Sequence, residues 1–212
     1  MGFIVGIDGT AGSGKGTVAK NIANKLKLVN IDTGSTYRCV ALAALRANAI
    51  KNGVIDEKKV IELLNKISIK IENTPSGDKV YLNGEDVTKK IREKDVSQVV
   101  SPVSSIEEVR YKMVDLQRKM AEGKDIIMEG RDICTYVFPN ADVKIYLDAS
   151  VEERARRRLL EMQEKKIEIT YEEVLDNIIK RDNNDKTKKI GALKLAPDSI
   201  VIDTTNLSIE EV

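Results

Sequence analysis

The chain has 212 residues, of which 42% are hydrophobic and 33% are charged, a balance typical of one soluble globular core with one or two smaller lobes. The 35 Lys and Arg residues nearly balance the 34 Asp and Glu residues, and a net charge of +1 argues against a protein that coats nucleic acid or an anionic membrane. The chain has no histidine, which excludes Ser-His-Asp and Cys-His catalysis and most zinc chemistry.

The first predicted element is a short buried strand over Phe3 to Asp8, followed by a glycine-rich turn and an amphipathic helix over 16–26. The turn reads GTAGSGK and matches the GxxxxGK phosphate-binding pattern in its required strand-turn-helix context. Glycines let backbone N–H groups converge on phosphate oxygens, and the lysine supplies a mobile charge for the β- and γ-phosphates. The residues expected to bind ATP here are Gly9, Thr10, Ala11, Gly12, Ser13, Gly14, Lys15, Gly16 and Thr17.

This pattern departs from the usual one directly after Lys15, where Gly16 stands and the hydroxyl comes one position later at Thr17. GTPases and motor-type ATPases place a Ser or Thr directly after the lysine to bind magnesium. The shift therefore argues against a hydrolase. It favours a kinase whose Mg²⁺ is held mostly by phosphates and water.

Four more short apolar runs predict strands along the chain. One ends at Asp32 and precedes a helix from about Thr36 to Asn48, and the others lie in DIIMEGRD from residue 125, DVKIYLDAS from 142 and SIVIDTT from 199. Apolar runs that alternate with helical stretches predict an α/β fold, with a five-stranded parallel sheet covered by helices on both faces. Its ligand would lie at the carboxyl ends of the strands, where the glycine turn already is.

Two stretches depart from this alternation. Residues 67–91 alternate apolar and polar residues around two turn signals, which predicts a small antiparallel hairpin or three-stranded sheet inserted into the core. Residues 152–189 are highly charged and helical in character, which indicates a mobile helical lobe. The predicted division is a core of residues 1–32, 101–150 and 191–212, a nucleotide-binding lobe of residues 33–100 and a lid of residues 151–190.

Several motifs occur in one order along the chain. The phosphate loop has the form GxxGxGKGT, residues 32–38 read DTGSTYR, GRD precedes TYVFPNADVKIYLDAS, and EERARRR is followed by KRDNND. Together they resemble the bacterial cytidylate kinase family of P-loop nucleoside monophosphate kinases, with matches from residue 6 to about residue 208. The resemblance implies a P-loop kinase fold with a small antiparallel sheet in the acceptor-nucleotide lobe and a helical lid.

The resemblance implies transfer of the γ-phosphate of ATP to CMP or dCMP, a step of pyrimidine nucleotide metabolism with Mg²⁺ as cofactor. In that scheme Arg38 and Arg131 hold the 5′-phosphate of the acceptor, since a forked cation suits a phosphate. Asp132 accepts from the 4-amino group of cytosine, which is the edge that distinguishes cytosine from uracil. The implied acceptor-binding residues are Thr33, Tyr37, Arg38, Ser101, Arg110, Arg131, Asp132, Arg181 and Asp185.

The sequence also suggests roles on the donor side. Arg154 and Arg158 lie four residues apart on one predicted helix face, directly after a strand, a position that suggests contacts with ATP. The residues expected to stabilise the transferred group are Lys15, Arg38, Arg131 and Lys188.

Two residues depart from the family pattern. Lys188 stands where the family has arginine, and Glu129 stands where it usually has aspartate. We expect Mg²⁺ to be held by ATP phosphates and water near Thr17 and Glu129, with no direct protein ligand. From the residues alone, Ser101 before Pro102 is interpreted as a helix N-cap.

The residue chemistry favours transfer over hydrolysis, because phosphoryl transfer needs positioned cations and exclusion of water rather than a histidine base. Two alternatives stay open. One is a kinase of another small acceptor, such as UMP, AMP or shikimate. The other is a nucleotide-sensing or RNA-binding module, against which stand the near-zero net charge and the scarcity of aromatic residues, with two Phe and no Trp.

Cys39 and Cys134 have no CxxC spacing, which indicates two reduced thiols rather than a zinc or disulfide site. No apolar run is long enough to span a bilayer and the N-terminus has no signal pattern, so we expect a cytoplasmic protein without membrane or nucleic-acid partners. Its expected partners are ATP and CMP or dCMP, and we expect a monomer. Ser208 and Glu211 have capping-box spacing and predict the start of a further helix.

Overall fold

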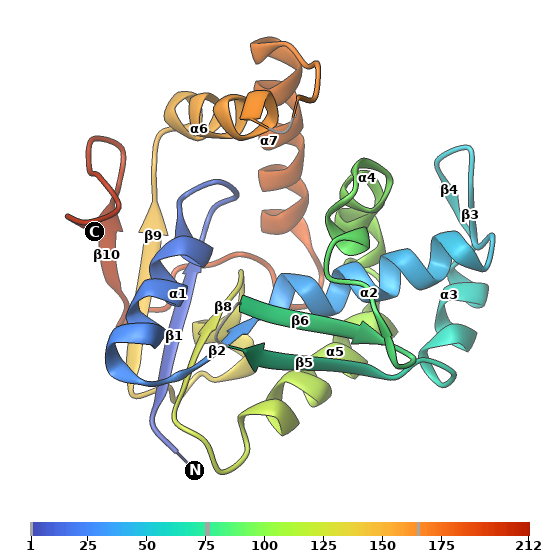
Figure 1. The fold of residues 1–212 in the computed structure, drawn as a ribbon, viewed down its shortest axis with the longest axis horizontal. Coiled ribbons are helices and arrows are strands. Elements are labelled where there is room, and N and C mark those ends of the chain that lie inside the picture. The colour runs from blue at the N-terminus through green and yellow to red at the C-terminus, as the bar shows by residue number, and fades with distance from the viewer. Residues whose placement is uncertain (1, 75–76, 165) are drawn as a thin grey trace.

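The computed structural model describes residues 2–74, 77–164 and 166–212, and its centre is a five-stranded parallel sheet (Figure 1). The strand order is β10-β9-β1-β8-β2, so the first strand of the chain lies in the middle. The strands are β1 (Ile4–Gly9), β2 (Val29–Asp32), β8 (Ile126–Glu129), β9 (Val143–Asp148) and β10 (Ile200–Asp203). All four pairings are parallel, which confirms the predicted fold class.

Helices cover both faces of this sheet because its central strands carry apolar side chains on both sides. Ile127 of β8 packs on one face against helix α1 (Lys15–Leu26). Its neighbour Ile126 packs on the opposite face with helix α5 (Glu107–Ala121) and the short π-helix η2 (Ile133–Val137). The ends of β1 and β8 therefore emerge between two helical layers.

A second lobe has its own apolar core, centred on the helix that follows β2. Its helices are α2 (Thr33–Arg46), α3 (Glu57–Leu64), the 3₁₀-helix η1 (Lys90–Arg92) and α4 (Lys94–Val103). The predicted insert is a three-stranded antiparallel sheet of β5 (Ile69–Thr74), β6 (Gly77–Leu82) and β7 (Glu85–Asp86), which lies beside α2 in Figure 1. Residues 75 and 76 of its predicted turn lie outside the described residues.

Two helix positions differ from the prediction. Helix α2 begins at Thr33 rather than near Thr36, because the Asp32 carboxylate accepts the backbone N–H of Ser35 and caps the helix there. Ser101 is not a helix N-cap. It lies inside α4, directly before Pro102, which stands in the last turn of that helix.

The structure also has a small hairpin that the prediction lacks, formed by β3 (Ile50–Lys51) and β4 (Val54–Ile55). Its turn is Asn52-Gly53, and both residues have positive φ, as a tight hairpin turn requires. The Asn-Gly pair is the sequence signal for this turn. Strands of two residues are too short to show an alternating pattern.

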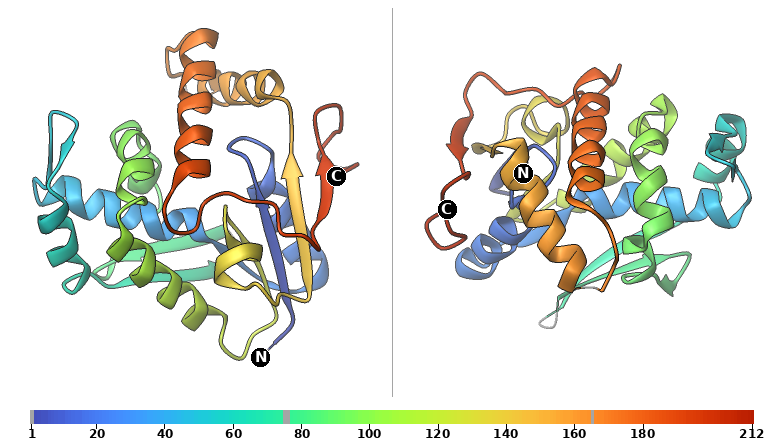
Figure 2. Two further views of the ribbon diagram at one scale, coloured as in Figure 1. Left: turned by 180° about the vertical axis from the view of Figure 1, so that it is seen from behind. Right: turned by 90° about the horizontal axis from the view of Figure 1, so that it is seen from above.

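The charged stretch forms two helices, α6 (Val151–Glu164) and α7 (Tyr171–Thr187), in keeping with its predicted helical character. They pack on each other through Ala155, Val174 and Ile178. In Figures 1 and 2 both helices lie beyond the carboxyl ends of the sheet strands. The domain boundaries and the mobility of this lobe stay predictions.

The predicted capping box near the end of the chain is present. Ser208 and Glu211 make both of its hydrogen bonds, at 2.8 Å and 3.3 Å, and a turn follows over 209–211. Cys39 and Cys134 are buried free thiols, as expected. Among the described residues, no helix combines the length and the apolar character needed to cross a membrane.

Candidate active site

The strand ends that lead into the predicted site lie side by side in the sheet (Figure 1). Glu129 at the end of β8 is in register with Ile7 of β1 and with Asp32 of β2. The phosphate loop follows β1, helix α2 follows β2, and the segment with Arg131 follows β8. The parallel sheet therefore brings the phosphate loop and the acceptor-side residues to one end.

The phosphate loop leaves β1 through a backbone conformation that favours glycine. Gly9 has a φ of +149°, and a Cβ at this position would overlap the carbonyl oxygen of Leu147 on the neighbouring strand β9. Gly14, with a φ of +91°, stands directly before α1. The loop can therefore take this course only without side chains at these positions.

Lys15 is buried and folded back onto the loop. Its Nζ donates to the Thr10 carbonyl at 2.6 Å and to the Ser13 hydroxyl at 3.3 Å. Burial lowers the pKa of Lys15, and the nearby Arg131 lowers it further, whereas Glu129 opposes the shift. An anion in the loop would favour the charged form of this lysine.

A buried ion pair joins the phosphate loop to both lid helices. Arg154 of α6 donates to the Asp182 carboxylate of α7 at 2.6 Å and to the Ala11 carbonyl at 3.0 Å. The Ala11 N–H donates to the other Asp182 oxygen at 3.4 Å. The structure thus places Arg154 at the backbone of the loop. Arg158, one turn later, is half-buried and pairs with Glu161 at 2.5 Å.

Three predicted site cations meet at one carboxylate, namely the acceptor-side Arg131 and Arg181 and the predicted catalytic Lys188. Asp185 accepts from Arg131 Nε at 2.9 Å and from Lys188 Nζ at 2.8 Å, and Arg181 Nε lies 4.0 Å away. Burial by itself would raise the pKa of Asp185, but these three cations hold it well below its usual range. Lys188 also donates to the Ser104 hydroxyl at 3.0 Å.

The predicted base-reading residues form a buried ion pair. Arg110 of α5 contacts Asp132 through Nη2 and Oδ2, and both side chains are at most 5% exposed. The Arg110 guanidinium also lies 5.0 Å from the centre of the Tyr37 ring, which is cation–π distance. Burial raises the pKa of Asp132, although Arg110 opposes that shift.

Two predicted hydroxyls join separate elements of the site. The Ser101 hydroxyl of α4 accepts a hydrogen bond from Asn184 of α7 at 2.5 Å. Thr33 donates to the Glu129 carbonyl at 2.8 Å, which fixes the start of α2 against the end of β8. Both hydroxyls thus lie where the second lobe meets the core or the lid.

Arg38 is held by its own lobe, where it donates to the Ile91 carbonyl at 3.0 Å and to the Ser97 hydroxyl at 2.9 Å. Its positive charge nevertheless acts on Arg181 of the lid helix α7. Burial lowers the pKa of Arg181 to about 10, and repulsion from Arg131, Arg38 and Arg158 contributes to the shift. Cations from the core, the second lobe and the lid therefore face a common region, which favours the binding of phosphate groups.

The carboxylates of Glu129 and Asp32 lie in register on neighbouring strands, and Glu129 faces the region where Mg²⁺ is expected. Burial raises the pKa of Glu129, and the neighbouring Asp32 raises it further. A Glu129 carboxylate oxygen would lie 3.0 Å from a Cβ on Gly16, so it faces the start of α1. Paired carboxylates suit a hydrated hard cation. Within residues 2–74, 77–164 and 166–212, no three acidic or cysteine side chains are grouped to hold a metal by themselves.

Three residues at the site have no predicted role, namely Asp8, Asp182 and Asn184. Asp8 is a charged residue inside a buried strand, which is the sequence signal that marks it. Asp182 and Asn184 lie on the same helix as Asp185, three residues and one residue before it. Their contacts with α6 and α4 are tertiary and leave no local pattern.

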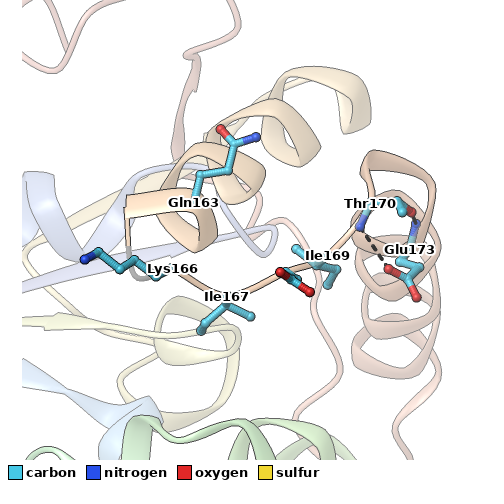
Figure 3. Close-up of a pocket in the computed structure, with 7 residues that line it drawn as sticks. Gln163, Lys166, Ile167, Ile169, Thr170 and Glu173 are labelled. Carbon is cyan, nitrogen blue, oxygen red and sulfur yellow. Dashed lines mark hydrogen bonds between the residues drawn. The ribbon is translucent and has the colours of Figure 1, made fainter.

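A cavity of about 680 Å³ lies at the turn between α6 and α7 (Figure 3). It is lined by Gln163, Lys166, Ile167, Glu168, Ile169, Thr170 and Glu173. There the Glu173 carboxylate accepts the Thr170 N–H at 2.9 Å as part of the capping box that begins α7. No predicted site residue lines this cavity, so we do not assign it to the active site.

Comparison with known proteins places these features in a family. The family model described as cytidylate kinase matches residues 5–212. A curated cytidylate kinase of Fusobacterium nucleatum is 51% identical over 210 residues, which cover 99% of this chain and 93% of that protein. A curated cytidylate kinase of Caldicellulosiruptor bescii is 48% identical over 208 residues, which cover 98% and 91%.

A solved structure is similar in fold alone. It is that of an uncharacterized protein from Eubacterium ventriosum, with a TM-score of 0.50 and 13% identity over 98% of this chain and 91% of that one. The family assignment rests on two findings: the family model matches almost the whole chain, and the curated relatives are about half identical to it. The chain belongs to the cytidylate kinase family.

Proposed function

We propose that this protein transfers the γ-phosphate of ATP to CMP or dCMP, giving CDP or dCDP and ADP. The observation that carries this proposal is the meeting of a phosphate loop with a second, cation-rich site around Asp185 and Asp132 at the same end of the sheet. A hydrolase needs only the loop, whereas a kinase needs an acceptor site facing it. The family assignment supports a cytidine monophosphate as the acceptor.

On the donor side, the phosphates of ATP would occupy the loop from Gly9 to Thr17. Lys15 would exchange its bond to the Thr10 carbonyl for the β- and γ-phosphates. Arg158 would leave Glu161 for a donor phosphate, since that pair is only half-buried. Arg154 would support ATP binding through the carbonyl of Ala11, which it already holds.

Mg²⁺ would neutralise charge on the ATP phosphates when bound. Glu129 and Asp32 would hold it through water, together with the hydroxyl of Thr17 in the first turn of α1. Glu129 keeps a carboxylate where the family usually has aspartate. These residues fit a hydrated cation because the two carboxylates lie in register on neighbouring strands.

On the acceptor side, Arg131 and Arg38 would hold the 5′-phosphate, and Asp185 with Arg181 would bind the sugar hydroxyls. Asp132 would accept from the 4-amino group of cytosine. Arg110 and Ser101 would bind the ring carbonyl and N3, with Thr33 and Tyr37 completing the site.

In the reaction, an oxygen of the acceptor phosphate attacks the γ-phosphorus. The bond from that phosphorus to the bridging oxygen of ADP breaks, and ADP leaves with the electron pair. No protein base is needed, because the acceptor phosphate is itself nucleophilic near neutral pH. Lys15, Arg38, Arg131 and Lys188 would stabilise the charge on the moving group.

We further propose that the protein works in the cytoplasm as a monomer, with ATP and CMP or dCMP as its partners. A formal net charge of +1 supports a role without nucleic acid or an anionic membrane. The two buried free thiols fit a reducing compartment.

The test is a coupled assay of ADP release from ATP-Mg²⁺, with CMP, dCMP, UMP, AMP, shikimate or no acceptor in parallel. We expect strong turnover with CMP and dCMP and little without acceptor. Asp132→Ala should reduce the preference for CMP over UMP more than it affects the KM for ATP. Equal ADP release in all reactions would indicate a hydrolase, and no turnover would favour a sensing module.

A further inference from the structure

Asp8 is a buried carboxylate for which the proposed reaction has no use. It lies on β1, directly before Gly9 and the phosphate loop, and is 1% exposed. Burying an ionisable group is unfavourable unless its hydrogen bonds are well satisfied. The contacts of Asp8 therefore indicate why a charged residue occupies a strand that is otherwise apolar or glycine.

Both oxygens of Asp8 are used, and by consecutive residues. The backbone N–H of Ile133 donates to Oδ1 at 2.8 Å, and the backbone N–H of Cys134 donates to Oδ2 at 2.7 Å. These are the first two residues of η2, whose N–H groups have no partner within the helix. A side chain from a distant strand thus caps the helix that begins directly after Asp132.

The same strand also holds the other side of Arg131 and Asp132. Gly130 donates its N–H to the Ile7 carbonyl at 2.9 Å, next to Asp8 in the chain. Arg131 and Asp132 are therefore bracketed by hydrogen bonds to two consecutive residues of β1. Because Gly9 follows at once, one strand fixes the phosphate loop and this dipeptide relative to each other.

We propose that Asp8 is a positioning residue for the acceptor nucleotide, which holds Arg131 and Asp132 in register with the phosphate loop. This inference rests on the proposed roles of Arg131 and Asp132 in binding CMP. A carboxylate suits the task because it offers one acceptor oxygen to each of the two N–H groups. The amide of asparagine has only one acceptor oxygen, and its NH₂ group is a donor that cannot accept from the second N–H.

The surroundings of Asp8 shift its pKa in opposite directions. Burial raises the pKa of Asp8 to about 6, although the N–H groups of Cys134 and Ile133 oppose this, and the nearby charge of Asp132 adds to the rise. Other titratable groups that it influences are Lys15 of the loop, Tyr146 of β9 and the thiol of Cys134. The fold thus keeps a carboxylate where burial disfavours it, in contact with the segment that carries the acceptor-binding residues.

The experiment compares Asp8→Asn with Asp142→Asn in the coupled assay. Asp142 is the matched control, because it accepts the N–H of Ile4 at 2.7 Å at the opposite end of β1. For Asp8→Asn we expect the KM for CMP to rise about tenfold, the preference for CMP over UMP to fall, and the KM for ATP to change less than about twofold. Asp142→Asn should match the parent protein in all three.

Arg131→Ala, measured in parallel, separates this inference from the proposed function. If Arg131→Ala leaves the KM for CMP unchanged, the proposed acceptor site is wrong. If it raises that KM while Asp8→Asn matches the parent, only the role of Asp8 is overturned. Equal increases in the KM for CMP and the KM for ATP would assign Asp8 to the phosphate loop and also overturn it.

Circular dichroism and thermal unfolding check that each variant is folded. If Asp8→Asn is not recovered as folded protein, Asp8→Ser replaces it, since a short hydroxyl also fails to reach both N–H groups. If neither variant folds while Asp142→Asn does, Asp8 serves the fold alone and the inference is overturned.

Discussion

At the scale of single residues, the site gathers positively charged side chains that would bind the phosphate groups of the nucleotides. Lys15 is bonded to a carbonyl and a hydroxyl rather than to a carboxylate. Burial lowers its pKa and that of Arg181, and Arg131 contributes to both shifts. Burying these like charges close together is energetically unfavourable in the protein without nucleotide, and bound phosphates would relieve their mutual repulsion.

This arrangement predicts proton uptake when ATP-Mg²⁺ binds. Because burial lowers the pKa of Lys15 in the free protein, its ammonium group loses its proton more readily than that of an exposed lysine, and bound phosphates would restore the charged form. Affinity for ATP should therefore fall as pH rises above neutrality. Calorimetry in two buffers of different ionisation enthalpy measures the uptake. Lys15→Arg is the control, and unchanged uptake in that variant would contradict the assignment.

At the scale of elements, α7 joins the parts of the site. Its Asp182 contacts the phosphate loop and α6, its Asn184 contacts Ser101 of α4, and its Asp185 gathers the acceptor-side cations. These three residues lie within one turn of the helix. A shift of α7 would therefore change the donor and acceptor sides together.

Asp182→Ala is expected to lower the free energy of unfolding by about 3 kcal/mol, because it leaves the buried Arg154 guanidinium without its carboxylate. The KM for ATP should rise as well, since the Ala11 N–H also loses an acceptor. Denaturant unfolding and the coupled assay measure the two effects. Asp176→Ala removes an exposed carboxylate of the same helix, paired with Lys180, and should leave both quantities nearly unchanged. Equal effects of the two substitutions would refute the argument.

At the scale of the molecule, the core, the second lobe and the lid helices each contribute cations to the site. The core carries Lys15 and Arg131, the second lobe carries Arg38, and the lid helices carry Arg158 and Arg181. The small apolar cluster between α6 and α7 is separate from the clusters of the sheet and the second lobe. Hydrogen bonds and ion pairs, such as those of Arg154 with Ala11 and Asp182, hold the lid helices against the core, and we expect bound phosphates to draw them closer.

Closure of the lid predicts a change in amide hydrogen exchange. Exchange in α6 and α7 should slow most when both nucleotide sites are filled, for example by adenosine and cytidine joined through a chain of phosphates, and less with either nucleotide alone. Exchange in the central strands β1 and β8 should stay slow throughout and serves as the internal control. Equal protection of α6 and α7 with ATP alone would mean that the acceptor takes no part in closure.

The fold class, the small inserted sheet, the two helices of the lid and the phosphate loop could all be predicted from the sequence alone. Each of these has a local signal, such as apolar runs, alternation around Asn83-Gly84, or the spacing from Gly9 to Lys15. The β3–β4 hairpin was missed because two-residue strands carry no period. The capping box of Ser208 and Glu211 was predicted from its spacing, and the structure shows both of its hydrogen bonds.

Which side chains meet could not be predicted from the sequence and became visible in the folded structure. Arg110 and Asp132 form their ion pair from α5 and from the end of β8, and Asp8 reaches η2 across 125 positions of the chain. The contacts of Arg154 with the loop backbone and with Asp182 could not be read from its spacing to Arg158, while its role toward ATP stays a prediction. The local sequence pattern shows the periodicity of a single helix or strand. These contacts depend instead on the order of the strands in the sheet and on which faces of the elements are buried. That order brings residues far apart in sequence to one end of the sheet.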